Sequence, residues 1–234
     1  GKLWNSILDI LREKARRGVE VRVIYDDIGS ITTLPSDYPA MLEMLGVHCR
    51  VFNRFVPVVS LRQNNRDHRK YMIIDGRVAF TGGINMADEY INVKPRFGHW
   101  KDSAIRLEGD AVWSMTVSFL SMWDFTHSEE ERFTPFRPAP ARAGAVGYVQ
   151  PYHDCPWDNE PVGQSVYLNL IYRAKRYVYI TTPYLVIDYS LTMALTNAAK
   201  SGVDVRIITP HIPDKKTVFE LTRSYYQELL EAGV

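Results

Sequence analysis

SILDILREKARRGVEVRVI, at residues 6–24, returns near the end of the chain as SLTMALTNAAKSGVDVRII at residues 190–208. The two stretches align without a gap, so that Arg22 coincides with Arg206. Agreement of this density over a whole stretch indicates an internal structural repeat. We therefore expect one supersecondary unit to occur twice in the chain.

Each copy predicts an amphipathic helix followed by a strand. Apolar residues recur at helical spacing before Gly18, a residue type that suits the position just past a helix end. Beyond it, Val21 and Val23 alternate with polar residues, which is typical of a strand. A second similarity, between residues 38–47 and 225–234, predicts a further helix in each copy. The unit is helix, strand, helix, strand, and the fold class is α/β.

The repeat divides the chain into two units and a linker. We assign residues 1–127 to the first unit, residues 128–150 to a linker rich in Pro and Ala, and residues 151–234 to the second unit. In the second unit a β-branched and aromatic run at 177–182 predicts a buried strand before the repeated helix. Its counterpart would precede the first unit. We therefore expect both units to be truncated, the first without its opening strand and the second without its catalytic residues.

Composition narrows the class of protein. The chain has 234 residues, 46% hydrophobic and 24% charged, which excludes a disordered or collagen-like chain. A net charge of +1 gives no strong positive field of the kind that non-specific nucleic-acid binders use. The two cysteines, Cys49 and Cys155, have no histidine at ligand spacing and predict neither a zinc site nor a disulfide framework. We expect no metal, no cofactor and no membrane span within this chain.

The chemical centre is the stretch DHRKYMIIDGRVAFTGGIN at residues 67–85. It predicts a strand, a two-residue Asp-Gly hairpin at 75–76 and a returning partner strand. Residues two apart on a strand share a face, so His68 and Lys70 point to the same side. An imidazole and an ammonium group therefore converge on one small volume.

This combination suits phosphoryl chemistry. The lysine cation disfavours a second positive charge nearby, which leaves the His68 ring available as nucleophile or base, and Lys70 can also bind an anion. The Gly-Gly pair that ends at Gly83 permits close approach of a ligand to the backbone, or unusual dihedral angles. Asn85, at the start of a helix predicted over residues 86–90, can donate to a phosphate oxygen. Together these residues predict a phosphoryl site.

Asp75 has two interpretations. Its parity relative to Lys70 is odd, which aims its side chain at the opposite face, and Asp-Gly forms turns in proteins of any function. Alternatively, its carboxylate takes part in the site. The residues leave both interpretations open.

The pattern H-x-K-x4-D-x6-G-G-x-N resembles the signature of the phospholipase D superfamily. The flanking residues, RDHRK at 66–70 and GGINMADEY at 82–90, look like those of bacterial cardiolipin synthases in that superfamily, and the resemblance extends to WKD at 100–102 and ITTPY at 180–184. It implies two similar α/β units, each a mixed sheet flanked by helices. The units would meet at a pseudo-two-fold axis, with one motif from each at a shared site.

The resemblance also implies covalent catalysis without a metal. His68 would attack the phosphorus of a phosphodiester to give a phosphohistidine, while the histidine of the other motif acts as general acid and then as base. Lys70 and Asn85 would hold the equatorial oxygens, Gly83 would border the substrate, and Asp75 would be the motif carboxylate. Cardiolipin synthases join two phosphatidylglycerols into cardiolipin and release glycerol.

If Asp75 faces away, another group must orient the His68 ring. Asp102, at the start of the next predicted strand, is our candidate; the alternative is a surface carboxylate at a strand end. Arg66 could contact a headgroup phosphate or remain a solvated loop residue. Arg69 is expected to form a surface ion pair.

Three functions remain open. The first is a phosphatidyltransferase acting on phosphatidylglycerol at the bacterial cell membrane, on its cytoplasmic side. The second is a phospholipase D-type phosphodiesterase or nuclease, although the net charge and the Gly-Gly pair argue against nucleic acid. The third is a non-catalytic domain that binds phosphate or a partner protein. Because the chain holds a single motif, we expect it to be inactive alone, with the second motif in the C-terminal part of the same protein.

Overall fold

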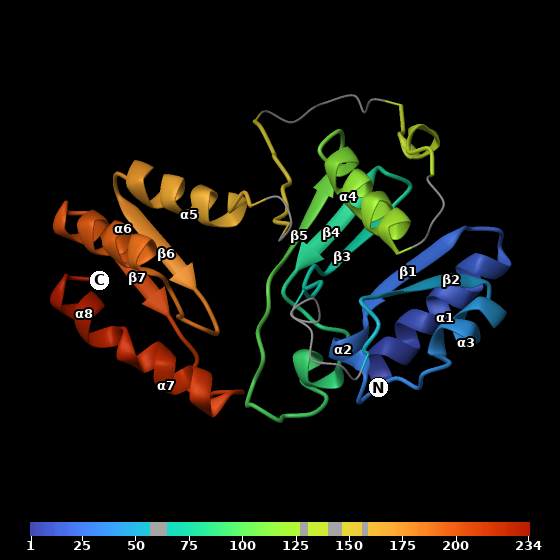
Figure 1. Cartoon of the computed structure of the whole chain (residues 1–234), viewed down its shortest axis with the longest axis horizontal. Helices are drawn as coiled ribbons and strands as arrows, with labels where there is room; N and C mark the ends of the chain where they lie inside the picture. Colours follow the sequence, from blue (N-terminus) through green and yellow to red (C-terminus); the bar gives the residue numbers. More distant parts are fainter. Residues whose placement is uncertain (57–64, 127–130, 140–146, 156–158) are drawn as a thin grey trace. The chain divides into compact units, whose positions relative to one another are not determined.

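The computed structural model describes residues 1–56, 65–126, 131–139, 147–155 and 159–234. Contacts divide the chain into two compact units (Figure 1). The first comprises Gly1–Pro95 and His99–Tyr152, and the second comprises Arg96–Gly98 and His153–Val234. Both units combine helices with strands, which confirms the α/β fold class. Part of the segment assigned as a linker, residues 128–130 and 140–146, lies outside the described residues.

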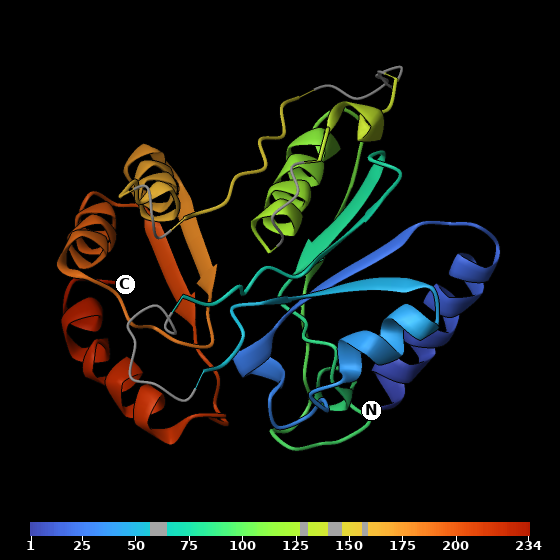
Figure 2. The same cartoon turned by 45° about the vertical axis from the view of Figure 1, so that its right-hand side comes forward.

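A parallel strand pair forms one half of the first unit. Strands β1 (Val21–Asp26) and β2 (Val47–Phe52) run side by side, with Val21 opposite Val47. Helices α1 (Lys2–Arg16) and α3 (Tyr38–Met44) cover one face of this pair, and Leu42 is buried between them and the strands (Figure 2). The short helix α2 (Asp27–Ser30) follows β1 directly.

An antiparallel sheet forms the other half of the first unit. Its order is β3-β4-β5, with bounds Tyr71–Ile74, Val78–Gly82 and Ala104–Glu108. Helix α4 (Val112–Phe125) packs on one face, where Ala79 and Met115 are buried. The expected mixed sheet is therefore present in the described residues as separate parallel and antiparallel parts.

The second unit repeats the helix and strand arrangement. Its strands β6 (Tyr177–Thr181) and β7 (Asp204–Ile208) are parallel. Helix α5 (Val162–Arg173) lies beside α6 (Tyr189–Lys200) (Figure 1). Two further helices follow, α7 (Lys216–Ser224) and α8 (Tyr226–Glu231). The core is made by apolar side chains of α5, α6, α8 and β7.

The two helix ends of the repeat have the same geometry. Gly18 and Gly202 adopt positive φ angles of 85° and 87°. The amide of Gly18 donates to the carbonyl of Ala15 at 2.9 Å, and the matching bond from Gly202 to Ala199 is also 2.9 Å. These bonds close the last helical turn in both copies, so the prediction of a glycine just past each helix is confirmed.

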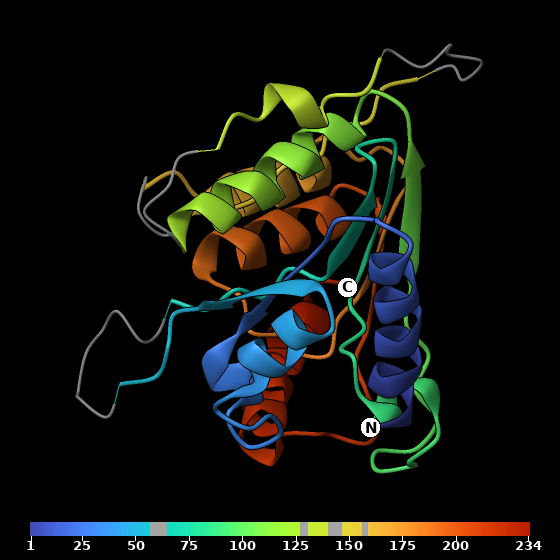
Figure 3. The ribbon, with the colours of Figure 1, turned by 90° about the vertical axis from the view of Figure 1, so that its right-hand side faces the viewer.

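Two local predictions are wrong. Residues 86–90 do not form an α-helix; a 3-10 turn, η2 (Asp88–Ile91), lies there instead. The carboxylate of Asp88 accepts hydrogen bonds from the backbone N–H groups of Lys2 and Leu3, both at 2.9 Å. The segment is therefore bound to the N-terminal end of α1 (Figure 3). The strand predicted at 177–182 is present as β6, but the prediction that it is buried is wrong, since exposed and half-buried residues alternate along it.

Candidate active site

His68 and Lys70 lie in the segment that leads into β3. The ammonium of Lys70 folds back along the chain and donates to the backbone carbonyl of His68 at 2.7 Å. The His68 side chain is exposed, whereas Lys70 is half-buried. The structure thus places the Lys70 cation against the backbone of His68, whose imidazole is accessible to solvent.

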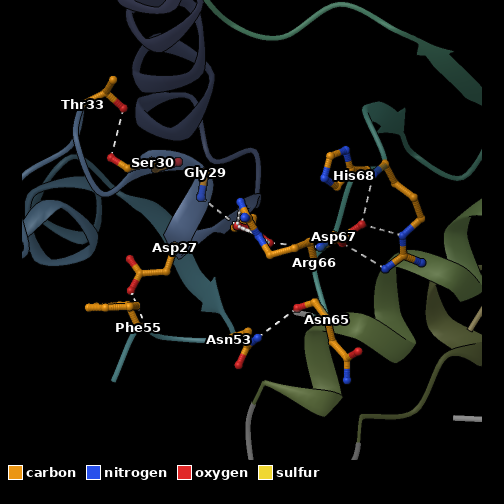
Figure 4. A network of polar contacts seen from close by, with 12 residues as sticks. Asp27, Gly29, Ser30, Thr33, Asn53, Phe55, Asn65, Arg66, Asp67 and His68 are labelled. Carbon is orange, nitrogen blue, oxygen red and sulfur yellow. Dashed lines mark hydrogen bonds and ion pairs between the residues drawn. The ribbon is translucent and has the colours of Figure 1, made fainter. Parts of the chain in front are cut away.

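Burial lowers the pKa of Lys70, because the half-buried ammonium loses hydration. The negative charges of Asp67, Asp26 and Asp102 act in the opposite direction and favour the cation. Three carboxylates therefore act on the lysine of the motif, one from its own segment and two, Asp26 and Asp102, from distant parts of the chain. Asp67 belongs to the hydrogen-bonded network drawn in Figure 4, and its backbone N–H donates to Asp26 at 3.0 Å.

This network accounts for Arg66 and Arg69. Arg66 pairs with Asp26 through its Nη2 atom at 2.7 Å, with its side chain 29% exposed, so the interpretation as a solvated loop residue is wrong. Arg69 pairs with Asp67 at 2.8 Å as expected, but that pair is half-buried and does not lie on the surface. Arg66 is held by Asp26 because the end of β1 and the loop meet in the folded unit, whereas Arg69 and Asp67 lie two residues apart in the same segment.

Asp75 forms the hairpin turn. Asp75 and Gly76 have φ angles of 53° and 62°, and the amide of Arg77 donates to the carbonyl of Ile74 at 3.0 Å. Two positive φ angles in succession define a type I′ turn, for which Asp-Gly is well suited. Strand β3 separates Asp75 from Lys70 by about 16 Å at the usual rise per residue. The geometry therefore favours the turn interpretation of Asp75.

The Gly-Gly pair allows close packing against the strand that follows. A side-chain carbon at Gly82 would lie 2.6 Å from the carbonyl oxygen of Ser103, and one at Gly83 would lie 2.9 Å from Oδ1 of Asp102. Neither glycine has a positive φ angle. Glycine is needed at both positions because the chain segments approach each other closely. This close approach brings Asp102 beside the motif.

Asp102 and Asn85 are both exposed. The Asp102 carboxylate accepts from the amide of Ser103 at 2.7 Å and from the indole of Trp100 at 3.4 Å. No hydrogen bond joins Asp102 to His68 in the described part of the chain. The orienting role of Asp102 and the phosphate-binding role of Asn85 stay predictions.

Sequence reasoning missed Asp26 and Ser118. Asp26 ends a parallel strand, and the carboxyl ends of parallel strands are where functional residues of α/β folds gather. That position was a usable signal. Ser118 lies on α4 and belongs to no sequence motif. Only folding brings its hydroxyl within 2.9 Å of Arg69 Nη1.

Within the described ranges, no group of three or more His, Cys, Asp or Glu side chains could hold a metal ion. No helix in the same ranges combines the length and apolar character that a membrane crossing requires.

The repeated α/β units and the His-Lys motif ahead of a hairpin are those of a phospholipase D-like domain. The family described as cardiolipin synthase, PLD-like domain matches residues 4–95 and 167–234. The chain belongs to this family.

Several relatives align with this chain over nearly its whole length. The chain is 38% identical to a cardiolipin synthase of Alkalihalophilus pseudofirmus over 237 residues, which cover 99% of the chain and 46% of the relative. It is 39% identical to the major cardiolipin synthase ClsA of Bacillus subtilis, covering 99% of the chain and 48% of that protein. An uncharacterized protein of Streptococcus mutans is 50% identical over 100% of the chain and 51% of its own length. The chain therefore spans about half the length of the curated relatives it matches.

Proposed function

We propose that the protein, in its full length, is a phosphatidyltransferase that joins two phosphatidylglycerols into cardiolipin and glycerol. The observation that carries this proposal is the pairing of His68 with Lys70, whose ammonium donates to the His68 carbonyl at 2.7 Å. It supports an exposed nucleophile beside a cation, which is what attack on an anionic phosphodiester requires.

The reaction takes two displacements. The His68 ring attacks the phosphorus of one phosphatidylglycerol, a P–N bond forms, and the P–O bond to the glycerol headgroup breaks. A general acid protonates the departing glycerol oxygen. A hydroxyl of the second phosphatidylglycerol then loses its proton to the same group and attacks, which breaks the P–N bond and frees His68. Lys70 and Asn85 hold the phosphate oxygens throughout.

The acid and base for these steps come from a second motif. The attacking and leaving groups lie on opposite sides of phosphorus in an in-line displacement, so one short motif cannot supply both. We propose that the second histidine belongs to the C-terminal part of the same protein. The reaction takes place at the cytoplasmic surface of the bacterial membrane, where the lipid substrate is found.

The test incubates the full-length protein with vesicles of phosphatidylglycerol and measures cardiolipin and glycerol. We expect equal amounts of the two products and no product from His68→Ala. His48→Ala is the matched control, because His48 is an exposed histidine of the same unit paired with Glu43 at 3.1 Å. Acid-labile phosphate trapped on the wild type and absent from His68→Ala would support the intermediate.

Two outcomes would contradict the proposal. If folded His68→Ala transferred phosphatidyl groups at the wild-type rate, His68 would be excluded as the nucleophile. Consumption of an oligonucleotide in preference to the vesicles would favour a phosphodiesterase on nucleic acid. The 234-residue chain alone is expected to give little or no cardiolipin, since it holds a single motif.

A further inference from the structure

Asp26 ends strand β1, and its carboxylate binds the segment that carries His68. Arg66 Nε donates to its two oxygens at 2.8 and 3.0 Å, and the backbone N–H of Asp67 donates at 3.0 Å. The backbone N–H of Gly29 adds a further bond at 2.9 Å. One carboxylate therefore fixes both residues that precede His68 to the end of strand β1.

The residue after His68 is held from the opposite direction. The Asp67 carboxylate accepts from the backbone N–H of Arg69 at 3.1 Å and from its Nε and Nη2 atoms at 2.8 and 3.0 Å. Arg69 Nη1 donates to Ser118 on helix α4 at 2.9 Å. The side chains of Asp67 and Arg69 are 16% and 23% exposed, so solvent screens this pair only weakly.

His68 lies between these two anchors, and its ring extends away from the bonds that hold its neighbours (Figure 4). Its chain position is set from both sides while its ring stays accessible. We infer that Asp26 is a positioning residue, which acts through Arg66 and the Asp67 amide to fix where the His68 imidazole meets phosphorus. This inference rests on the proposed function of His68. Displacing a reacting group by about 1 Å can cost about 100-fold in rate.

The internal repeat sets Asp26 apart. In the alignment of the two copies, Asp26 coincides with Pro210, which offers no carboxylate. The second copy forms the same helix and strand without an acid at that place. The repeated helix and strand therefore form without this acid. In the first copy the Asp26 carboxylate binds both the start of α2, through Gly29, and the two residues that precede His68.

The test compares Asp26→Asn with Asp9→Asn in the full-length protein. Asp9 is the matched control, an aspartate of the same unit in an exposed pair with Arg12 at 3.2 Å. Initial rates with phosphatidylglycerol vesicles give kcat and KM separately. We expect Asp26→Asn to lower kcat by about tenfold or more with KM within about twofold, and Asp9→Asn to change neither.

A second readout needs no turnover. In protein labelled with 15N-histidine, the ring resonances of His68 are assigned by their loss in His68→Ala. They should shift or double in Asp26→Asn and stay unchanged in Asp9→Asn. Arg66→Lys keeps the charge but loses the planar fork, so it should produce a smaller change in the same direction. If Asp26→Asn does not fold, the Arg66→Lys variant tests the positioning role in its place.

Unchanged kcat in folded Asp26→Asn or Arg66→Lys, or His68 resonances identical to those of the wild type, would overturn the positioning role. A wild type without transfer, combined with shifted His68 resonances in Asp26→Asn, would refute the proposed function and leave the positioning role standing.

Discussion

Arg22 holds Glu131 across 109 positions of the sequence, with Nη2 of the arginine 2.7 Å from Oε1 of the carboxylate. The guanidinium also lies over the rings of Trp123 and Phe136, with centroid distances of 5.1 and 5.0 Å. The Arg22 side chain is 15% exposed. The segment that follows α4 is therefore tied to strand β1 by one half-buried side chain.

Arg22→Lys should loosen this segment, because lysine keeps the charge but loses the fork and the ring stacking. We expect a fall of about 1–3 kcal/mol in the free energy of unfolding by urea and faster proteolysis within residues 131–139. Arg206→Lys is the control supplied by the repeat: its pair with Asp204 and its place over the Tyr179 ring, at 5.2 Å, are both exposed, so a loss below about 1 kcal/mol is expected. Equal effects of the two variants would contradict this account.

Gly82→Ala and Gly83→Ala should differ although the glycines are neighbours. The new carbon at Gly82 would meet backbone of Ser103, which cannot move without disturbing the β4–β5 pairing, whereas at Gly83 it would meet the end of the exposed Asp102 side chain, which can turn aside. Urea unfolding should show a loss of about 1–3 kcal/mol for Gly82→Ala and less than about 1 kcal/mol for Gly83→Ala. The reverse order would refute the packing argument. A folded Gly83→Ala with slow transfer would support a role in the site for the close approach of Gly83 and Asp102.

Asp75→Asn and Asp75→Ala separate the two interpretations of Asp75. Asparagine tolerates the left-handed conformation and alanine does not, so alanine should cost about 1–2 kcal/mol in unfolding free energy and asparagine much less. As a turn residue, Asp75→Asn should keep the wild-type transfer rate. A stable Asp75→Asn protein that has lost transfer would instead favour a carboxylate with a chemical role.

The hydrogen bonds of Asp26 should make the stability of the protein depend on pH under acidic conditions. Burial opposes ionisation of Asp26, but the bonds from Arg66, Gly29 and Asp67 outweigh it, and its pKa lies below the usual value. A carboxyl whose pKa is lowered by folding contributes stability that is fully present above its unfolded value, about 3.9, and is lost as the pH falls through the folded value.

We therefore expect the Tm difference between wild type and Asp26→Asn to be constant from about pH 7 to pH 5 and to shrink below about pH 4. Thermal unfolding followed by circular dichroism at each pH measures it, with Asp9→Asn as the parallel control. A difference that persists unchanged well below pH 3, or that changes between pH 5 and 7, would show that ionisation of Asp26 is not the source.

Much of the fold could be predicted because it rests on local chemistry. Gly18 and Gly202 end their helices as predicted, since the left-handed position past a helix end is set by the residue itself. Asp75-Gly76 forms its turn for the same reason. The helix predicted over 86–90 failed because Asp88 binds the first amides of α1, a contact that no local pattern reveals.

The sequence by itself determined the repeated helix and strand, the α/β class and the His-Lys motif, because these depend on residue type and on spacings of a few positions. Only the tertiary structure decided what surrounds the motif. Asp26 reaches Arg66 across 40 positions, and Asp102 closes on Gly83. Such contacts depend on which strand ends meet when apolar faces are buried, and that choice is made by the whole unit at once.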